Sequence, residues 1–233
     1  MRSEFAGSFN VKEFTKRDID QAYRDLGHRW GWSFMGVPSE RLHSAQVAFV
    51  GLNPGGGGEK DTYPYGHLWE SESVNCYYDE QWGSNGNTDS PLQTQVKEWH
   101  RLLGLRPDDP LCIQFCPFRS PNWKSLAKRE DSIAFAKDLW RWVLSVSSAR
   151  LFVTMGKLPA QYLADLMGAK WMASHPTGWG RQTIDVYVCP DSKRIIAMPH
   201  PSRFRIFGRG EELSGDVERA FLAAADATGP VQK

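Results

Sequence analysis

Short, continuous apolar runs alternate along this chain with longer segments of helical periodicity. The runs "AQVAFVGL" (45–52), "PLCIQFCPF" (110–118) and "ARLFVTMG" (149–156) have the length of strands and are apolar at successive positions. Strands that are apolar on both faces are typical of parallel sheets covered by helices on either side. The sequence therefore predicts an α/β fold.

The remaining segments complete this prediction. "TIDVYVCP" and "KRIIAMPH" flank "DS" and predict a hairpin or a strand pair. Residues 53–91 show no sustained period and predict a long ordered loop with at most one short helix. Helical periodicity predicts helices over about 11–30, 92–104, 129–146, 158–168 and 211–226. The 233 residues fit one domain, 1–233, with a frayed tail at about 227–233.

Composition narrows the class of protein. The hydrophobic fraction is 41% and the charged fraction 24%, as in soluble globular proteins, and no apolar run approaches the roughly 18 residues of a membrane span. The opening "MRSEFAGSFNVKEF" has no apolar export segment. We therefore expect a cytoplasmic protein, associated with the nucleoid if it is bacterial, and no membrane partner.

The four cysteines, Cys76, Cys112, Cys116 and Cys189, form no C-x-x-C pair. Cys112 and Cys116 lie within an apolar run that is predicted to be a strand. Buried free thiols are the main prediction, and a metal or iron–sulfur site is the alternative.

Polar residues follow the predicted strands. In a parallel sheet the carboxyl ends of the strands share one edge, where ligands bind. The loops that start at Asn53, near Gln114, near Gly156 and at His200 should therefore converge. Alone, Asn53 could equally be a turn-capping residue before proline, and a single histidine is usually structural. Lys157, after the Gly156 turn, is expected to be exposed, although it could contact a phosphate.

The loop "GLNPGGGGEKD" after the first strand is rich in glycine. Its amides could cradle an anion, but it matches neither the Walker pattern nor the dinucleotide fingerprint. Tyr63, Tyr65 and Trp69 follow, and each could stack on a planar ligand or pack in the core.

His200 lies between Pro199 and Pro201, which restrict its backbone and would aim its imidazole at low entropic cost. Although the net charge is only +1, the segment between residues 192 and 210 contains no acid and five cations, which are Lys193, Arg194, Arg203, Arg205 and Arg209. This cluster could face phosphates or could be a solvated loop.

At this point the motifs resemble a family. "VAFVGLNPGG" and "MPHPSRFR" resemble the two signature motifs of the uracil-DNA glycosylase superfamily, and "CIQFCPFRSPN" and "ARLFVTMGKLPAQYL" resemble its intervening segments in the right order, over about residues 45–225. The resemblance implies a three-layer α/β/α fold with a central, mainly parallel four-stranded sheet. The G-x-N-P-G form is most similar to the single-strand-selective and mismatch-specific branches.

By this resemblance, Asn53 positions the attacking water and His200 donates to uracil O2. Tyr65 stacks on the flipped base, with Tyr63 and Trp69 as fallbacks. Gly55 stands where other branches place a tyrosine that blocks the methyl group of thymine. Gln114 stands where the uracil-reading branches carry asparagine, so a different base, or a pocket that no longer reads uracil, stays open.

The segment after His200 would meet the DNA. Because a base must leave the duplex before it is attacked, Phe204 is expected to fill the gap as a wedge, while Ser202, Arg203 and Arg205 hold phosphates. No cysteine precedes Cys76, so we expect no iron–sulfur cluster, and the chemistry requires no metal or other cofactor.

The resulting hypothesis is a monomeric, monofunctional DNA glycosylase that hydrolyses the N-glycosidic bond of uracil in single- or double-stranded DNA and leaves an abasic site for base excision repair. A glycosylase for hypoxanthine or xanthine is a second hypothesis, and a non-catalytic DNA-binding member of the superfamily is a third. If the fold assignment is wrong, a small-molecule hydrolase with a glycine-rich anion site remains.

Overall fold

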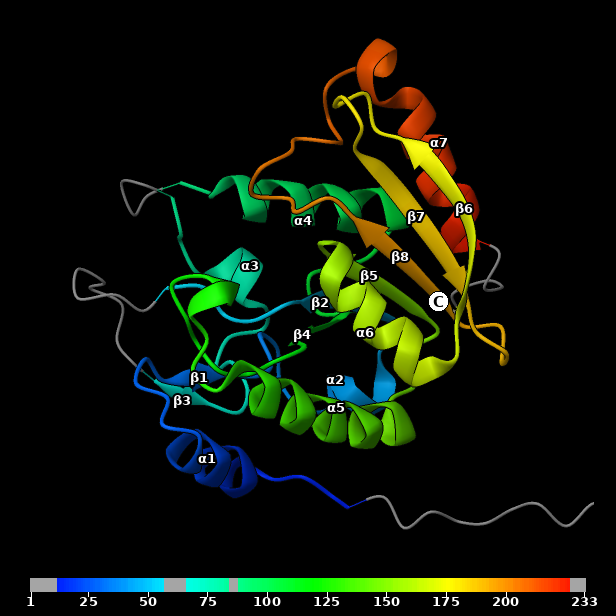
Figure 1. The fold of residues 1–233 in the computed structure, drawn as a ribbon. Coiled ribbons are helices and arrows are strands. Elements are labelled where there is room, and N and C mark those ends of the chain that lie inside the picture. Colours follow the sequence, from blue (N-terminus) through cyan, green and yellow to red (C-terminus); the bar gives the residue numbers. More distant parts are fainter. Residues whose placement is uncertain (1–11, 57–65, 84–87, 227–233) are drawn as a thin grey trace, which may run out of the picture.

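Helices and strands alternate through residues 12–56, 66–83 and 88–226, which are the residues that this computed structural model describes (Figure 1). The helices are α1 (Lys16–Asp25), α2 (Arg41–Ser44), α3 (Cys76–Asp79), α4 (Pro91–Leu103), α5 (Arg129–Val146), α6 (Lys157–Met167) and α7 (Glu211–Asp226), with a 3-10 turn at Trp123–Ser125. The strands are β1 (Trp32–Ser33), β2 (Val47–Gly51), β3 (His67–Leu68), β4 (Leu111–Gln114), β5 (Leu151–Met155), β6 (Lys170–Pro176), β7 (Thr183–Val188) and β8 (Arg194–Met198).

The central sheet has six strands in the order β4-β2-β5-β8-β7-β6, and β1 pairs with β3 in a separate two-stranded sheet. Strands β4, β2, β5 and β8 are parallel, whereas β7 and β6 are antiparallel. The predicted α/β class with a mainly parallel sheet is confirmed, but the predicted number of four strands is wrong. The four predicted parallel strands are present, and β7 and β6 extend the sheet beyond β8.

Strand β6 escaped prediction because its sequence, "KWMASHP", carries no apolar pattern. It lies at the edge of the sheet and pairs only with β7, so most of its residues are exposed. Burial cannot leave a periodic signal in a strand that is hardly buried. By contrast, β7 and β8 form the strand pair that the sequence predicts.

Helices cover both faces of the sheet (Figure 1). Helices α4 and α7 contact each other on one face, and α5 and α6 contact each other on the opposite face. Trp99 of α4 packs on Phe49 of β2, while Trp140 of α5 packs on Phe115, just after β4. Both tryptophans are buried, so these aromatic contacts join the helices to the sheet through the core.

The strand order determines where a site can form. From β2 the chain reaches β4 on one side through α4, and it then crosses to β5 on the other side of β2 through α5. The two connections lie on opposite faces of the sheet, so their loops diverge at the carboxyl end of β2. Such a switch point leaves a crevice, which is where ligands bind in open α/β sheets.

The N-terminal helix is shorter than the predicted span of 11–30. Asp18 accepts hydrogen bonds from the backbone N–H and the hydroxyl of Thr15, which caps the start of α1. The helix ends before Gly27, whose φ of 70° is left-handed and stops the helix. In the predicted loop of residues 53–91, the one short helix is α3 as far as the described residues go.

Candidate functional site

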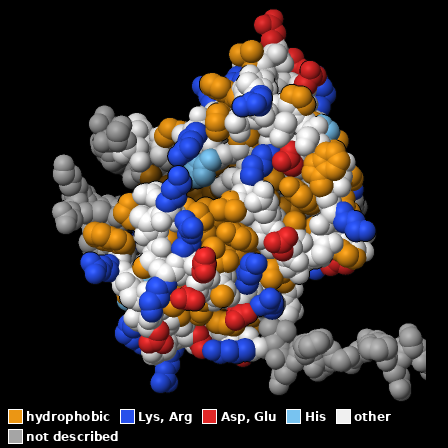
Figure 2. Space-filling model, viewed as in Figure 1, with side chains coloured by type: hydrophobic (Ala, Val, Ile, Leu, Met, Phe, Trp, Pro, Cys, Tyr) orange, Lys and Arg blue, Asp and Glu red, His pale blue; other side chains and the backbone are white. Residues whose placement is uncertain are grey.

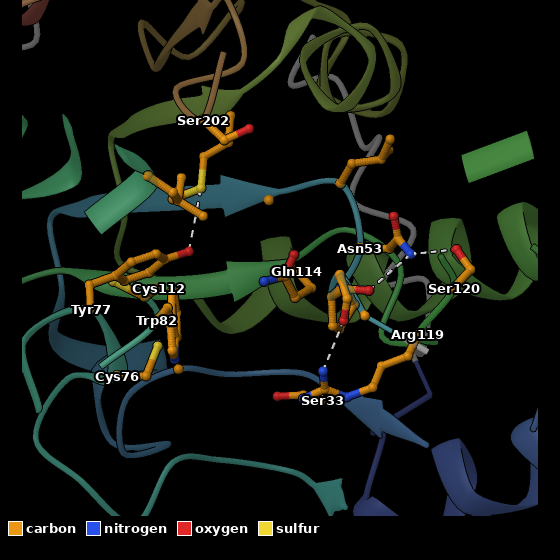
Figure 3. Close-up of a pocket in the computed structure, with 18 of the residues that line it drawn as sticks. Ser33, Asn53, Cys76, Tyr77, Trp82, Cys112, Gln114, Arg119, Ser120 and Ser202 are labelled. Atoms are coloured by element: carbon orange, nitrogen blue, oxygen red, sulfur yellow. Dashed lines mark hydrogen bonds between the residues drawn. The ribbon is translucent and has the colours of Figure 1, made fainter. Parts of the chain in front are cut away.

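A pocket of about 770 Å³ opens at the carboxyl ends of the four parallel strands (Figure 3). Asn53 enters it from the loop after β2, Gln114 from the end of β4, Met155 from the end of β5, and His200 from the segment after β8. The expected convergence of the four strand ends is therefore confirmed. The pocket brings together polar side chains that are up to 147 positions apart, from Asn53 to His200.

Asn53 is held by the segment that follows β4. Its Nδ2 donates to Ser120 Oγ at 2.9 Å and to the carbonyl of Phe118 at 3.1 Å, as Figure 3 shows for Ser120. A carbonyl can only accept, so this contact fixes which side of the amide carries nitrogen. The Oδ1 atom makes no hydrogen bond within the described residues and is left as an acceptor for a water or a ligand.

Gln114 carries a buried acceptor without a partner. Its Oε1 is shielded from solvent and accepts no hydrogen bond within the described residues. Gly51 is its neighbour in the β2–β4 register, and a Cβ atom at Gly51 would lie 2.1 Å from this Oε1. The glycine thus makes room for the amide. An unsatisfied buried acceptor costs about 1–3 kcal/mol.

His200 is aimed by the turn that follows it. The backbone N–H of Ser202 donates to His200 Nδ1 at 3.3 Å, and Ser202 Oγ lies 2.8 Å from the same nitrogen. Because the N–H group is a donor only, Nδ1 must be the acceptor, and the neutral ring carries its proton on Nε2.

The charge state of His200 supports this assignment. His200 is exposed as a whole residue, but the protein atoms beside its ring still lower its pKa, and the neighbouring cation of Arg203 lowers it further. The imidazole is therefore neutral near pH 7. A neutral imidazole with its proton on Nε2 can donate one hydrogen bond without bringing a full charge.

The glycine-rich loop lies at the edge of the same pocket. Gly55 lines it, and the Gly55 carbonyl accepts from Arg119 Nη1 at 2.9 Å. A Cβ atom at Gly55 would have no heavy atom of the described residues within 4 Å, so these residues leave the space beside it open. Tyr65 and Tyr63, the predicted stacking residues, lie outside the described residues.

Trp69, the other fallback for stacking, is a packing residue. Its ring lies 5.4 Å from that of Phe34 and 5.8 Å from that of Trp142. It does not line the pocket. The expectation that it might stack on a ligand is not supported by this position, because its ring is engaged with the core.

The segment after His200 divides into two parts. Ser202 and Arg203 are exposed and line the pocket, whereas Phe204 and Arg205 lie beyond its lining. Phe204 is only partly exposed and meets the ring of Trp179 edge-on, with 6.1 Å between ring centres. Arg205 is exposed, and its Nη2 donates to the carbonyl of Gly208 at 2.6 Å. Phe204 would have to leave this packing to act as a wedge.

Three residues in the pocket were not singled out from the sequence. Ser120 holds Asn53, Arg119 ties the glycine-rich loop to the segment after β4, and Tyr77 donates from its hydroxyl to Met155 Sδ at 3.4 Å on the pocket wall. The run "RSPN" directly after an apolar strand was the available signal for the first two. Tyr77 had none, because it lies in the long aperiodic loop.

The cysteines and Lys157 contribute no exposed reactive group among the described residues. Cys112 and Cys116 are buried free thiols as predicted, and burial raises the pKa of each to about 12. Cys189 is also buried, and Cys76 is partly so. Lys157 is half-buried rather than exposed, because its Nζ lies 2.7 Å from Asp185 Oδ2. In the part of the chain that the structure describes, no three His, Cys, Asp or Glu side chains gather as metal ligands would.

Comparisons of the sequence with protein families and with curated proteins give no match: no protein-family model matches this chain, and no curated protein is significantly similar to it in sequence. None of the helices in the described ranges is long and apolar enough to cross a membrane. The function is therefore inferred from the chemistry of the pocket and from the motifs at the strand ends.

Proposed function

We propose that this protein is a monofunctional DNA glycosylase that hydrolyses the N-glycosidic bond of uracil in DNA after the nucleotide has turned into the pocket. The observation that carries the proposal is one pocket that combines a free acceptor on Asn53, a neutral donor on His200 and an unpaired buried acceptor on Gln114. The resemblance of the strand-end motifs to the uracil-DNA glycosylase superfamily supports it.

The two strand-end residues have complementary roles in this proposal. Cleavage of the C1′–N1 bond builds positive charge on the sugar and negative charge on the departing base. His200 Nε2–H donates to uracil O2 and stabilises the negative charge, while Asn53 Oδ1 accepts from the water that attacks C1′. Each contribution is worth about 10²- to 10³-fold in rate if it resembles a single oxyanion donor.

Gln114 would then select the base by its protonation pattern. Uracil presents a ring N–H where cytosine presents a lone pair, so an amide oxygen turned toward the base would attract the first and repel the second. Hypoxanthine and adenine differ in the same way. A Gln114 amide that turns its Oε1 to the bound base would therefore favour deaminated bases over their parents.

The size of the pocket favours a second candidate function. The pocket volume is about 770 Å³ and the described residues leave open space beside Gly55, so the pocket has room for a base larger than a pyrimidine. A glycosylase that releases hypoxanthine or xanthine is therefore the alternative. A DNA-binding protein without catalysis is the third possibility that an experiment must separate.

Base release from labelled oligonucleotides separates the three candidates. Substrates carry uracil, hypoxanthine or xanthine, either in single strands or mispaired, and wild type is compared with Asn53→Ala and His200→Ala. His43→Gln is the matched control, because His43 is exposed in α2, at the opposite end of the sheet.

Uracil release that falls about 10²-fold or more in both pocket variants, and not in the control, would support the proposal. Release of purines alone would favour the second candidate. DNA binding without release of any base would leave the third.

A further inference from the structure

The turn between β6 and β7 presents a tryptophan beside the segment that follows His200. Trp179 is 41% exposed, although its ring meets Phe204 edge-on at 6.1 Å. Phe204 directly follows Arg203, which lines the pocket. The indole therefore lies next to the rim of the proposed active site, on a hairpin that the four-stranded parallel core does not need.

The position of Trp179 is fixed by its surroundings. Its Nε1 donates to the carbonyl of Arg205 at 2.7 Å, and its carbonyl accepts from the backbone N–H of Gln182 at 2.9 Å. Gly178 and Gly180 flank it with φ values of 75° and 54°. Two left-handed glycines make the tight turn, and the hydrogen bonds hold the exposed ring in place.

Arg209 covers part of the indole. Its guanidinium carbon lies 5.7 Å from the ring centre of Trp179, and its Nη2 donates to the carbonyls of Thr177 and Leu213 at 2.7 and 2.6 Å. The Arg209 guanidinium thus donates hydrogen bonds to backbone carbonyls and packs against one side of the indole ring. The ring keeps its exposed surface even with this support, as a platform for a second planar group would.

Three exposed cations lie close in sequence to Trp179 or to Phe204, which contacts it. Arg181, two positions after Trp179, is exposed, and so are Arg203 and Arg205. None of the three forms an ion pair within the described ranges. Figure 2 shows basic side chains near a histidine on the face of the molecule that is viewed in Figure 1. One exposed aromatic ring near cations without ion-pair partners matches the chemistry of a nucleic-acid strand, which offers stacking bases and phosphates.

We propose that Trp179 stacks on a base that neighbours the nucleotide in the pocket, while Arg181 and Arg203 contact the adjoining phosphates. The proposal rests on the proposed function, since it assumes a DNA strand at this rim. It adds the β6–β7 hairpin to the DNA-contacting surface, which the motif residues 202–205 alone do not include. A polyanion that offered no bases would use the arginines but not the indole.

The test is binding of fluorescently labelled single-stranded uracil-containing oligonucleotide, measured by anisotropy with wild type and two opposed variants of Trp179. Trp179→Phe keeps an aromatic ring but loses the bond to the Arg205 carbonyl. Trp179→Gln keeps an N–H donor but loses the ring. Trp171→Ala is the control, because Trp171 is 61% exposed on β6 but does not adjoin Phe204.

If stacking operates, Kd rises about 5- to 100-fold in Trp179→Gln and only slightly in Trp179→Phe or the control. The loss should shrink on an oligonucleotide whose residues beside the uracil are abasic, because the base to be stacked is gone. Equal affinity of wild type and Trp179→Gln would overturn the inference. A loss of affinity in Trp179→Phe alone would also overturn it, because it would show that only the hydrogen bond to the Arg205 carbonyl matters.

Failure of this inference is distinguishable from failure of the proposed function. Wild type that releases no base and binds no oligonucleotide would refute the proposed function. Wild type that releases uracil, with Trp179→Gln binding normally, would refute only the role of Trp179. Thermal unfolding is measured for each variant. If the melting temperature of a variant falls, its affinities for the two oligonucleotides, with bases or with abasic residues beside the uracil, are compared, because both values come from the same protein.

Discussion

Gly51 and Gln114 show how one missing methyl group shapes the site. They are register partners at the ends of β2 and β4, and a Cβ atom on Gly51 would overlap Gln114 Oε1. Nothing in the backbone of Gly51 requires glycine, since its φ is not left-handed. The glycine is therefore explained by the neighbouring amide rather than by a turn.

Gly51→Ala is expected to push Gln114 out of position and to lower kcat/KM for uracil release about 10-fold or more, while the fold persists. Steady-state base release measures the effect. Gln114→Ala and the double variant complete a cycle: if the methyl group acts through Gln114, the double variant is no worse than Gln114→Ala alone. Additive losses would contradict this explanation.

The contact between Asn53 and the Phe118 carbonyl requires an amide rather than a carboxylate. Asn53 Nδ2 faces the carbonyl of Phe118 at 3.1 Å, which offers no proton to a carboxylate. Asn53→Asp is therefore expected to place two acceptors face to face and to reduce base release about as strongly as Asn53→Ala, although it retains an oxygen for the water. Rates measured for both variants at pH 7 check this. If Asn53→Asp were as active as wild type, the contact with the Phe118 carbonyl would not matter for catalysis.

The limits of sequence reasoning are also visible at single residues. Asn53, Gln114 and His200 were placed together because each lies at or near the end of a predicted strand, and strand ends of a parallel sheet converge. The packing of Trp69 and Phe204 was not predictable, because an aromatic residue in a loop has the same sequence signature whether it faces a ligand or another ring. Which partner it meets depends on segments far away in the chain.

Among the elements, the long helices were the most predictable. The span 129–146 predicted for one helix coincides with α5, because its apolar stripe is bounded by acidic residues at the start and a strand-forming segment after the end. Helices α4 and α6 were predicted to within one residue of each end. Strand β6 was missed because pairing with β7, not burial, creates it.

Helix α6 is joined to the antiparallel part of the sheet by Lys157. Its Nζ contacts Asp185 Oδ2 and donates to the carbonyl of Ala197 at 3.2 Å, so one side chain links α6, β7 and β8. Burial lowers the pKa of Lys157, which Asp185 partly offsets. The link also lies near the pocket, because Gly156 immediately precedes α6 and lies beside His200.

Lys157→Met is expected to destabilise the fold by about 1–2 kcal/mol, less than for a fully buried pair, since it leaves the Asp185 carboxylate short of a partner. Urea unfolding measures the change in free energy. Adding Asp185→Asn should restore part of the loss. If the double variant were less stable by the sum of both single losses, the two side chains would not be coupled.

For the whole molecule, two buried histidines contribute to the loss of stability in acid. Burial lowers the pKa of His28 and that of His100 to about 4. His100 stacks on Phe49 with 4.8 Å between ring centres, and neither ring nitrogen has a hydrogen-bond partner within the described residues. In the unfolded chain these rings accept a proton near pH 6.5.

Between about pH 6.5 and pH 4 the unfolded state therefore binds more protons than the folded state, and stability is expected to fall as the pH falls. His100 alone should contribute on the order of 3 kcal/mol over this interval. His100→Leu is expected to flatten the curve of unfolding free energy against pH. Urea titrations at several pH values measure the two curves. An unaltered slope in His100→Leu would refute this role.

Each of the four parallel strands contributes a side chain to the pocket at or near its carboxyl end, so formation of the pocket depends on folding of the sheet. No contiguous fragment of the chain that lacks β2 or β8 can hold both Asn53 and His200 in place. The contacts that assemble the pocket are nonlocal in sequence, so they form late and at a high cost in loop entropy. Ligand binding in the pocket should therefore appear only when the whole parallel sheet has formed, and the pocket serves as an internal reporter of complete folding.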